Sequence, residues 1–422
     1  MVEVIPFRGL HYAELKASVL APPYDVISPA QRRRLLARDP FNIVRVDLGP
    51  TPTPPEWYTK AAENLARWVA TGVLVREERP LLYGYQQHFS LEDGRRRVRT
   101  GFLARVRLAE WGQGIHRHEH TRMEPRADRL RLMETTQAQL SPVFGLYRDP
   151  EGELRRWLEP PAQPWYDGLD EDGVRHIFWP LTDPATMAAL VEGMRSKEVV
   201  IADGHHRYET ALTYRAERRR AEGNPPTPQP YDYVLMYLTA LEDPGLEILA
   251  THRVITHLPV LNGLSFLKSC ARDFELIPVR DTTLREAVAR AAGDTVAIGV
   301  ELGWAGAWVL RLKDMERARR AAGAGADLAE LDVCVLQNLI FRPRLGITPE
   351  LLTIGELVHY TIHEEEARAA VQRGEAQVAF ILNPTKPEQV WQAACRGVTL
   401  PPKSTYFYPK LLTGLVINPL DG

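Results

Sequence analysis

The chain has 422 residues and a formal net charge of −2, with 45% hydrophobic and 25% charged residues. These ordinary values predict a globular protein with no overall field to attract nucleic acid or an acidic membrane. At about 100–200 residues per domain, the length predicts two or three domains. Three scattered cysteines indicate neither a disulfide framework nor a zinc finger and fit a reducing cytoplasm. We see no signal peptide and no apolar stretch long enough to span a membrane.

Alternating helices and strands are predicted for the first part of the chain. Ser28 and the residues after it are typical of a capped helix start. Residues 42–48 alternate between apolar and polar and predict a strand, whereas residues 58–69 have the spacing of an amphipathic helix. Two strand-like runs, 81–90 and 95–108, flank Asp93-Gly94 and predict a hairpin.

The later elements follow from apolar runs and helical spacing. Pro125 opens a predicted helix, and residues 148–178, rich in proline, tryptophan and acidic residues, predict an insertion with many loops. Strands are expected at 143–147, 198–202, 233–241, 296–300, 307–312 and 378–382, and helices near 326–341 and 363–373.

The strongest local signal is the run Asp203-Gly204-His205-His206-Arg207. An apolar strand leads into a tight glycine turn, and a helix begins at about His205. Backbone N–H groups and the positive dipole end make such a helix start an anion site, and Arg207 adds a planar fork suited to phosphate. Asp203 could hold magnesium or orient a histidine. The plainer alternative is a capped helix start with histidines facing solvent.

A second signal alternates histidines around a carboxylate: His116, His118, Glu119 and His120. In extended structure the three histidines share one face, which allows a zinc site. The plainer alternative is a polar loop with incidental histidines. We prefer Glu119 as a general base or metal ligand beside the phosphate site. Charge around it would come from residues near the start of the next helix, namely Arg126, Asp128 and Arg129.

Two further motifs suit a substrate with charged ends. Near the C-terminus, lysines and hydroxyls stand between aromatic residues, namely Lys403, Ser404, Thr405 and Lys410. Near the N-terminus, two prolines make a rigid turn that presents Tyr24 and Asp25. A C-terminal strand with solvated lysines, and a simple turn, are the corresponding structural alternatives.

Several common site motifs are absent from the sequence. It contains neither G-x-x-x-x-G-K-[ST] nor a G-x-G-x-x-G after a strand, so nucleotide binding of the P-loop or Rossmann kind loses support. It also lacks the G-x-S-x-G and H-E-x-x-H motifs of hydrolases and metalloproteases.

Taken together, the motifs APPYDVIS, HEHT, VVIADGHHRYETAL, THR and KSTYFYPK resemble the family known as domain of unknown function number 1015, over nearly the whole chain. The central part also resembles the ParB and sulfiredoxin-like superfamily, which includes free-serine kinases. The resemblance implies an α/β (mixed α+β) fold with a ParB/sulfiredoxin-like core and α/β additions at both ends. The expected domains are 1–110, a catalytic core at 111–260 with an insertion at 148–195, and 261–422.

The resemblance also implies roles for the residues singled out above. The chain would be a phosphotransferase that moves a phosphoryl group from pyrophosphate, ATP or ADP to free L-serine. Glu119, Asp203 and His205 would be catalytic, with Glu119 as the base, and Asp203 and Glu119 would hold Mg²⁺. Donor phosphate would be bound by Gly204, His205, His206 and Arg207, and from its position we expect Arg129 to add charge there. From the residues themselves we expect the charged ends of the substrate to be bound by the C-terminal lysines or by Tyr24 and Asp25. The full set of expected substrate residues is Tyr24, Asp25, His118, Thr121, Lys403, Ser404, Thr405 and Lys410.

Two other functions remain open from the residues alone. A metal-dependent hydrolase could use His116, His118 and His120 together with His205 and His206. A DNA-partition module is disfavoured by the near-neutral charge. We therefore expect a cytoplasmic enzyme of serine metabolism, a monomer or homodimer, with no nucleic-acid or membrane partner.

Overall fold

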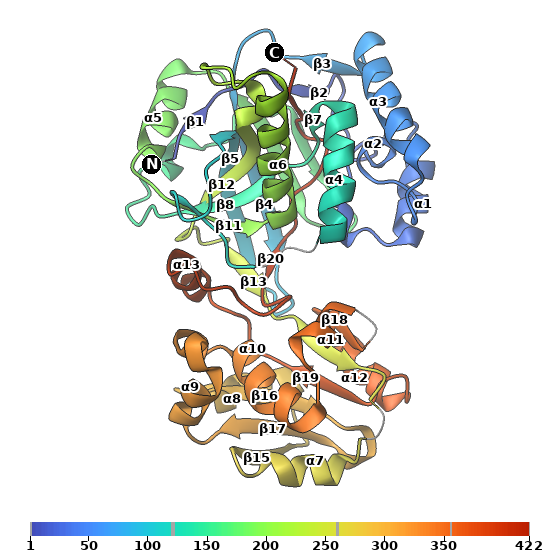
Figure 1. Cartoon of the computed structure of the whole chain (residues 1–422), viewed down its shortest axis with the longest axis vertical. Coiled ribbons are helices and arrows are strands. Elements are labelled where there is room, and N and C mark those ends of the chain that lie inside the picture. The colour runs from blue at the N-terminus through green and yellow to red at the C-terminus, as the bar shows by residue number, and fades with distance from the viewer. Residues whose placement is uncertain (1, 120–122, 259–260, 355–356, 422) are drawn as a thin grey trace. The chain divides into compact units, whose positions relative to one another are not determined.

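The structure is a computed structural model that describes residues 2–119, 123–258, 261–354 and 357–421 (Figure 1). Backbone contacts divide the chain into two compact units. The first comprises Met1–Arg117, Thr121–Leu246 and Pro409–Gly422, and the second His118–His120 and Glu247–Tyr408. Each unit combines helices with sheets, which confirms the predicted mixed α/β class.

The first unit is built on one large mixed sheet. Among the described residues, nine strands form it in the order β6-β11-β8-β12-β5-β4-β10-β9, with β1 paired to β5. The predicted segments 1–110 and 111–260 both supply strands to this sheet, and the division into three segments stays a prediction. The strands are β1 (Val4–Ile5), β4 (Leu82–Ser90), β5 (Arg96–Arg107), β6 (Ile115–His116), β8 (Val143–Tyr147), β9 (Tyr166–Leu169), β10 (Arg175–Leu181), β11 (Val199–Asp203) and β12 (Tyr233–Ala240).

The sheet confirms the predicted hairpin and extends into the predicted insertion. Strands β4 and β5 pair antiparallel around the turn at Gly94, whose φ is +81°. Residues 148–178 were expected to be mainly loop, yet β9 lies within them and β10 begins there, and β10 pairs with β4. In that pair Gly84 lies opposite Trp179, and a Cβ on Gly84 would lie 2.2 Å from the indole ring. The close approach explains why glycine occupies this strand position.

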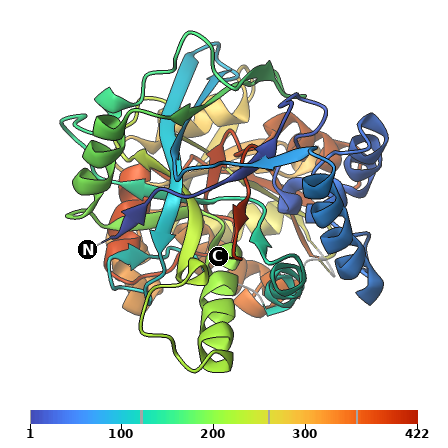
Figure 2. The same ribbon diagram turned by 90° about the horizontal axis from the view of Figure 1, so that it is seen from above.

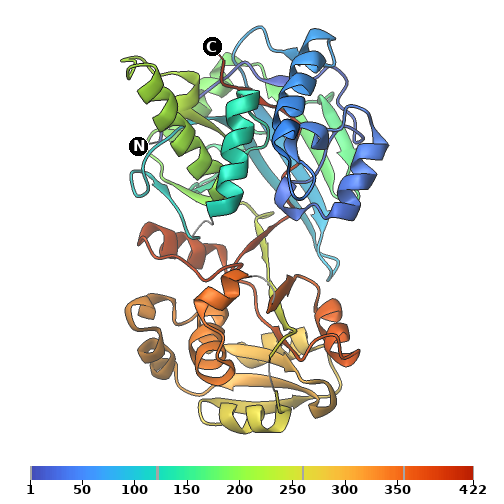
Figure 3. The same cartoon turned by 45° about the vertical axis from the view of Figure 1, so that its right-hand side comes forward.

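Helices cover the sheet of the first unit. Figures 1 and 3 show α4 and α6 side by side, and Figure 2 shows α3 and α5 on opposite sides of this unit. The predicted cap is confirmed, because Ser28 Oγ accepts a hydrogen bond from Gln31 N at 3.2 Å. The main helices of this unit are α1 (Pro29–Arg38), α3 (Pro55–Ala70), α4 (Met123–Thr136), α5 (Pro184–Met194) and α6 (His205–Ala221).

The strand predicted at 42–48 is wrong, since a short helix, α2 (Val44–Asp47), forms there. Asn42 starts the helix: its side-chain oxygen accepts from Val44 N at 3.0 Å, and its amide donates to the carbonyls of Ser18 and Leu20. These tertiary contacts override the alternating pattern. The apolar Val46 and the polar Asp47 are both buried, so burial does not alternate as it would in a strand with one exposed face.

The second unit contains a separate sheet and its own core. Six strands of the described residues form it in the order β15-β17-β16-β19-β14-β18, and β13 pairs with β20. Its apolar cluster includes Val309, Leu284 and Ile381. The strands are β13 (Glu247–Leu249), β14 (His252–Ile255), β15 (Phe274–Val279), β16 (Ala297–Glu301), β17 (Ala307–Leu312), β18 (Val358–Thr361), β19 (Val378–Ile381) and β20 (Tyr406–Tyr408).

Of the two helices predicted in the second unit, one is confirmed and one is divided. The helix predicted at 363–373 is α12 (Glu364–Gln372). The one predicted at 326–341 is divided, because the 3₁₀ turn Gly323–Leu328 precedes α10 (Asp332–Val335), which runs into the π-helical segment Leu336–Leu345. The other helices are α7 (Gly263–Cys270), α8 (Leu284–Ala292), α9 (Met315–Ala322), α11 (Pro349–Ile354) and α13 (Pro387–Cys395). Across the described ranges, none of the helices has the length and apolar character needed to cross a bilayer.

Candidate functional site

The turn between β11 and α6 is the centre of the candidate site. Strand β11 is buried between β6 and β8, and its last residue is Asp203. Gly204 follows with a φ of +90° as the N-cap of α6, and the helix begins at His205 as the sequence predicts. The left-handed backbone favours glycine, and a Cβ at this position would lie 2.9–3.0 Å from the guanidinium of Arg207. The glycine therefore allows Arg207 to fold back over the turn.

Two cations bind the carboxylate of Asp203. Lys410 Nζ lies 2.9 Å from Oδ1, and Arg207 Nη2 lies 2.7 Å from Oδ2. Arg207 also donates to the carbonyl of Pro142. Burial alone would raise the pKa of Asp203, but Lys410 and Arg207 outweigh it and lower that pKa below its ordinary value. The turn thus holds two fixed cations at the N-terminus of a 17-residue helix.

The histidines of the motif lie in the first turn of α6. His205 is buried, with 4% of its surface exposed, and its charge is among those that lower the pKa of Asp203. His206 is half-buried. His116, in β6, binds Glu198 instead, with 3.2 Å between Nε2 and Oε1.

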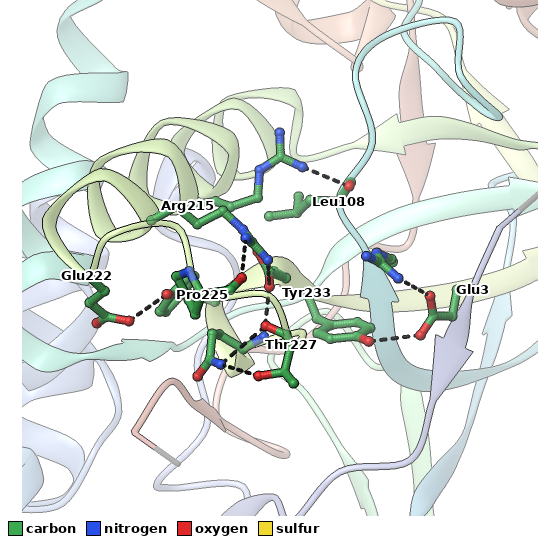
Figure 4. A network of polar contacts seen from close by, with 12 residues as sticks. Glu3, Leu108, Arg215, Glu222, Pro225, Thr227 and Tyr233 are labelled. Carbon is green, nitrogen blue, oxygen red and sulfur yellow. Dashed lines mark hydrogen bonds and ion pairs between the residues drawn. The ribbon is translucent and has the colours of Figure 1, made fainter.

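The other end of α6 is anchored by a polar network (Figure 4). Arg215 donates to Leu108 O at 2.8 Å, and Arg219 binds both oxygens of Asp232 at 2.6 Å. Tyr233, where β12 begins, donates to Glu3 at 2.8 Å. The contacts of Arg215 and Arg219 tie the C-terminal half of α6 to residues next to the end of β5 and the start of β12.

A buried charge cluster contains the predicted residues Arg129 and Tyr24. Arg129 Nη1 donates to Asp47 O at 2.7 Å, its other nitrogens bind Asp128 Oδ2 at 2.6 and 2.9 Å, and its guanidinium lies 4.2 Å from the centre of the Tyr24 ring. Burial would lower the pKa of Arg129, but the carboxylates of Asp47 and Asp128 raise this pKa overall. Burial raises the pKa of Asp47, and that of Tyr24 to about 12.

This cluster adjoins the turn. The charge of Arg207 acts on both Tyr24 and Asp47, and that of Asp25 acts on Asp47. A cavity of about 40 Å³ is lined by Arg129, Arg207, Asp47 and the buried hydroxyl of Thr210, among others. The structure therefore brings the N-terminal motif and the turn into one neighbourhood of the first unit.

Glu209 stands within the VVIADGHHRYETAL motif, although the sequence assigned it no role. It is 7% exposed and lies one helical turn after His205. Its two oxygens accept hydrogen bonds from Arg117 at 3.2 Å and Arg126 at 3.3 Å. These arginines flank the segment that carries Glu119. Its spacing of one helical turn from His205 did not reveal this role, which depends on the two distant arginines.

The second unit holds the remaining predicted residues. Glu119 is half-buried, next to His118, which is 1% exposed. His118 Nε2 lies 3.0 Å from Thr405 Oγ1, and the carbonyl of His118 accepts from Leu400 N at 2.8 Å. His118 of the HEHT motif thus contacts Thr405 of the KSTYFYPK motif within the second unit. His120 and Thr121 lie outside the described residues.

Lys403 stands at a strained turn in the second unit. Its φ is +57°, the left-handed region that non-glycine residues seldom adopt. Arg253 donates to Lys403 O at 3.0 Å, and Ser404 Oγ donates to Pro401 O at 2.6 Å. Thr385 Oγ1 donates to Ser404 O at 2.9 Å. The exposed lysine is therefore presented by a turn fixed from several sides.

The turn of the first unit fits an anion better than a metal ion held by protein. Mg²⁺ prefers oxygen ligands that are free to coordinate it. Both oxygens of Asp203 already bind cations, Lys410 and Arg207. The residues at this turn therefore suit phosphate, and the assignment of Mg²⁺ to Asp203 and Glu119 stays a prediction.

The chain can now be placed in a class of proteins. The model of the family described as "Protein of unknown function (DUF1015)" matches residues 4–334. The chain belongs to this family, in agreement with the resemblance of its motifs. Comparison with curated proteins gives no match.

Solved structures give distant matches. A conserved hypothetical protein from Pyrococcus furiosus is 13% identical at a TM-score of 0.34, over 74% of this chain and 92% of that one. A free serine kinase in complex with AMP is 12% identical at 0.34, over 73% and 86%. SbnI with a C-terminal truncation from Staphylococcus aureus is 11% identical at 0.33, over 74% and 85%. At these TM-scores we draw no argument about activity from the matches.

Proposed function

We propose that the protein is a small-molecule kinase that transfers a phosphoryl group to the hydroxyl of free L-serine. The donor is pyrophosphate, ATP or ADP. The proposal rests on the chemistry of the turn at Asp203 and on the resemblance of the motifs to free-serine kinases. Pyrophosphate has a modest advantage among the donors, because the sequence has no recognisable motif for binding a nucleotide base.

The observation that carries the proposal is the pair of cations on Asp203. Phosphoryl transfer depends on positioning and on neutralising the charge of the phosphates rather than on covalent chemistry. Lys410 and Arg207 are held in fixed positions by one carboxylate at the start of α6. Together with the backbone N–H groups of the helix start, they form a preorganised anion site.

Glu119 is the proposed general base. It would accept the proton of the serine hydroxyl as the oxygen attacks the phosphorus, which requires hydrogen-bond reach to the acceptor. His205 would donate to the phosphate, since it lies in the same helical turn as Arg207. In this proposal Lys403 and Thr405, beside His118, bind the charged ends of the amino acid.

Magnesium has a limited part in the proposal. A divalent cation would neutralise further charge on the donor phosphates. We expect it to reach the site bound to the donor, because Asp203 is occupied by Lys410 and Arg207. The protein's own residues would bind and orient the substrates and accept the hydroxyl proton.

The decisive experiment is an assay of phosphoserine formation. The purified chain is incubated with L-serine and Mg²⁺, with pyrophosphate, ATP and ADP offered in separate reactions. Phosphoserine from one donor supports the proposal and identifies that donor. If folded protein yields no phosphoserine with any of the three, the proposed function is wrong. L-threonine and L-homoserine serve as matched acceptors to define specificity.

A further inference from the structure

Two arginines bind backbone carbonyl groups at the two ends of the KSTYFYPK segment. Arg253 binds carbonyls at its beginning, in the second unit, and Arg99 binds a carbonyl at its end, in the first unit. Both side chains are buried, with 4% and 0% of their surface exposed.

Arg99 lies in the interior of the first unit. It extends from β5, donates to the carbonyl of Pro409 at 2.5 Å and to Gln87, and its guanidinium lies 4.7 Å from the centre of the Phe144 ring. Gln87 in turn donates to the carbonyl of Lys410 at 2.8 Å. The carbonyl groups of Pro409 and Lys410 are therefore both held by side chains of strands β4 and β5.

Arg253 performs the same task in the second unit. It extends from β14 and donates to Lys403 O at 3.0 Å, to Pro402 O at 3.4 Å and to Thr251 O. Burial lowers its pKa to about 10. Within the described ranges its hydrogen-bond acceptors are carbonyl groups, and its guanidinium lies 5.5 Å from the centre of the Tyr360 ring.

A buried guanidinium is costly to desolvate, and a hydrophobic residue could fill the same volume. Its advantage is a rigid set of donors that binds carbonyl oxygens in a fixed geometry. At Lys403 this geometry holds a left-handed backbone, and at Lys410 it directs the ammonium group to Asp203. In both places the backbone that the arginine holds carries a lysine side chain.

We propose that Arg99 and Arg253 are positioning residues, which present Lys410 and Lys403 to anionic groups of the substrates by fixing the backbone of the KSTYFYPK segment. The identity of those anionic groups rests on the proposed function. The positioning itself does not, and it can be measured on the full chain without any substrate.

The first test is the rate at which each lysine is acetylated by acetic anhydride, measured by mass spectrometry of peptides. In the Arg99→Met variant, the backbone of Lys410 is no longer fixed and its charged hydrogen bond to Asp203 weakens, so its acetylation rate should rise by about tenfold. The rate of Lys403 should not change. In Arg253→Met the rate of Lys403 should change, and that of Lys410 should not.

Arg105→Met is the matched control. Arg105 also donates to a carbonyl of the C-terminal segment, Pro419 O, at 2.6 Å, but it contacts neither lysine of the motif. Its removal should leave both acetylation rates unchanged. Equal changes at both lysines in all three variants, or no change in either arginine variant, would overturn the proposal. If a methionine variant does not fold, Arg99→Lys and Arg253→Lys retain the charge and fewer donors, and the same pattern must appear in them.

Pyrophosphate binding, measured by calorimetry, separates this inference from the proposed function. Weaker binding in Arg99→Met, by about tenfold for the loss of one oriented charged donor, supports both. A selective change in acetylation with unchanged pyrophosphate affinity would retain the positioning role and remove pyrophosphate from the proposed site.

Discussion

Lys410 and Asp203 form an ion pair of 2.9 Å although 207 positions separate them in the sequence. The pair places Lys410, the last residue of the KSTYFYPK motif, beside the DGHHR turn within the first unit. Arg207 completes the arrangement from the opposite oxygen of the same carboxylate. Asp203 thus organises two cations, and its role as a metal ligand stays a prediction.

Replacing Asp203 tests that role. We expect Asp203→Asn to lower kcat/KM for phosphoserine formation by about 100-fold, because the neutral amide no longer holds Lys410 and Arg207 by charge-assisted hydrogen bonds. The control is Asp183→Asn, at the N-cap of α5, where asparagine caps as well as aspartate. Activity of Asp203→Asn equal to that of the control would contradict the organising role.

Replacing Glu119 tests the proposed base. Glu119→Gln preserves the shape of the side chain but cannot accept the hydroxyl proton, so we expect turnover to fall by about 100–10,000-fold with the melting temperature unchanged. Glu198→Gln is the control, since Glu198 also lies beside a histidine, His116, without a proposed part in the chemistry. Steady-state kinetics and thermal melting measure both effects, and full turnover in Glu119→Gln would exclude it as the base.

Much of the local structure could be predicted because it depends on short-range patterns. The turn at Gly204, the hairpin at Gly94 and the cap at Ser28 all follow from residues within a few positions of one another. The failure at residues 42–48 has the opposite cause. There Asn42 binds carbonyls more than twenty positions away, and the sequence pattern carries no trace of that contact.

In the candidate site, too, features with a short-range pattern could be predicted and features that depend on tertiary contacts could not. The DGHHR turn and the lysines could be found from composition and spacing. The buried partners Arg99, Arg253 and Glu209 could not, because their importance depends on which distant carbonyls and side chains they reach. A single arginine in a strand looks like any exposed charge until the fold buries it.

The glycine of the turn gives a third prediction. Gly204→Ala places a Cβ in a left-handed backbone and 2.9–3.0 Å from the guanidinium of Arg207. We expect it to lower the free energy of unfolding by about 1–2 kcal/mol and to weaken pyrophosphate binding. Gly94→Ala is the matched control, with a φ of +81° and open space for a Cβ. It should show the same loss of stability, measured by urea unfolding, with unchanged affinity. Equal affinity for pyrophosphate in both variants would contradict the idea that a Cβ at position 204 displaces Arg207.

Lys410 supplies a fourth prediction. Lys410→Met removes the cation on Asp203 Oδ1, and we expect the dissociation constant for pyrophosphate to rise by about tenfold or more, since one charged hydrogen bond is lost. Lys410→Arg should recover part of the affinity. Lys60→Met, at an exposed position of α3, controls for the change in net charge. The same shift in Lys60→Met would mean that the effect arises from overall charge.

Asp332, in the second unit, supplies a prediction about pH. Burial raises its pKa to about 6, and hydrogen bonds from Asn383 at 2.9 and 3.0 Å only partly offset that effect. The folded protein thus binds a proton at Asp332 more tightly than the unfolded chain, whose pKa is about 4. The resulting stability is fully present below about pH 4 and is lost as the pH rises through 6.

Asp332→Asn should remove this dependence, because an asparagine oxygen accepts the same hydrogen bonds without titrating. At pH 7.5 the variant should be more stable than the original protein by up to about 3 kcal/mol, for a difference of about two pH units in the pKa. Urea unfolding between pH 4.5 and 7.5 measures it. Asp314→Asn, at the exposed N-cap of α9, is the control and should follow the original protein. If the stability of Asp332→Asn runs parallel to that of the original protein over this range, folding does not raise the pKa of Asp332.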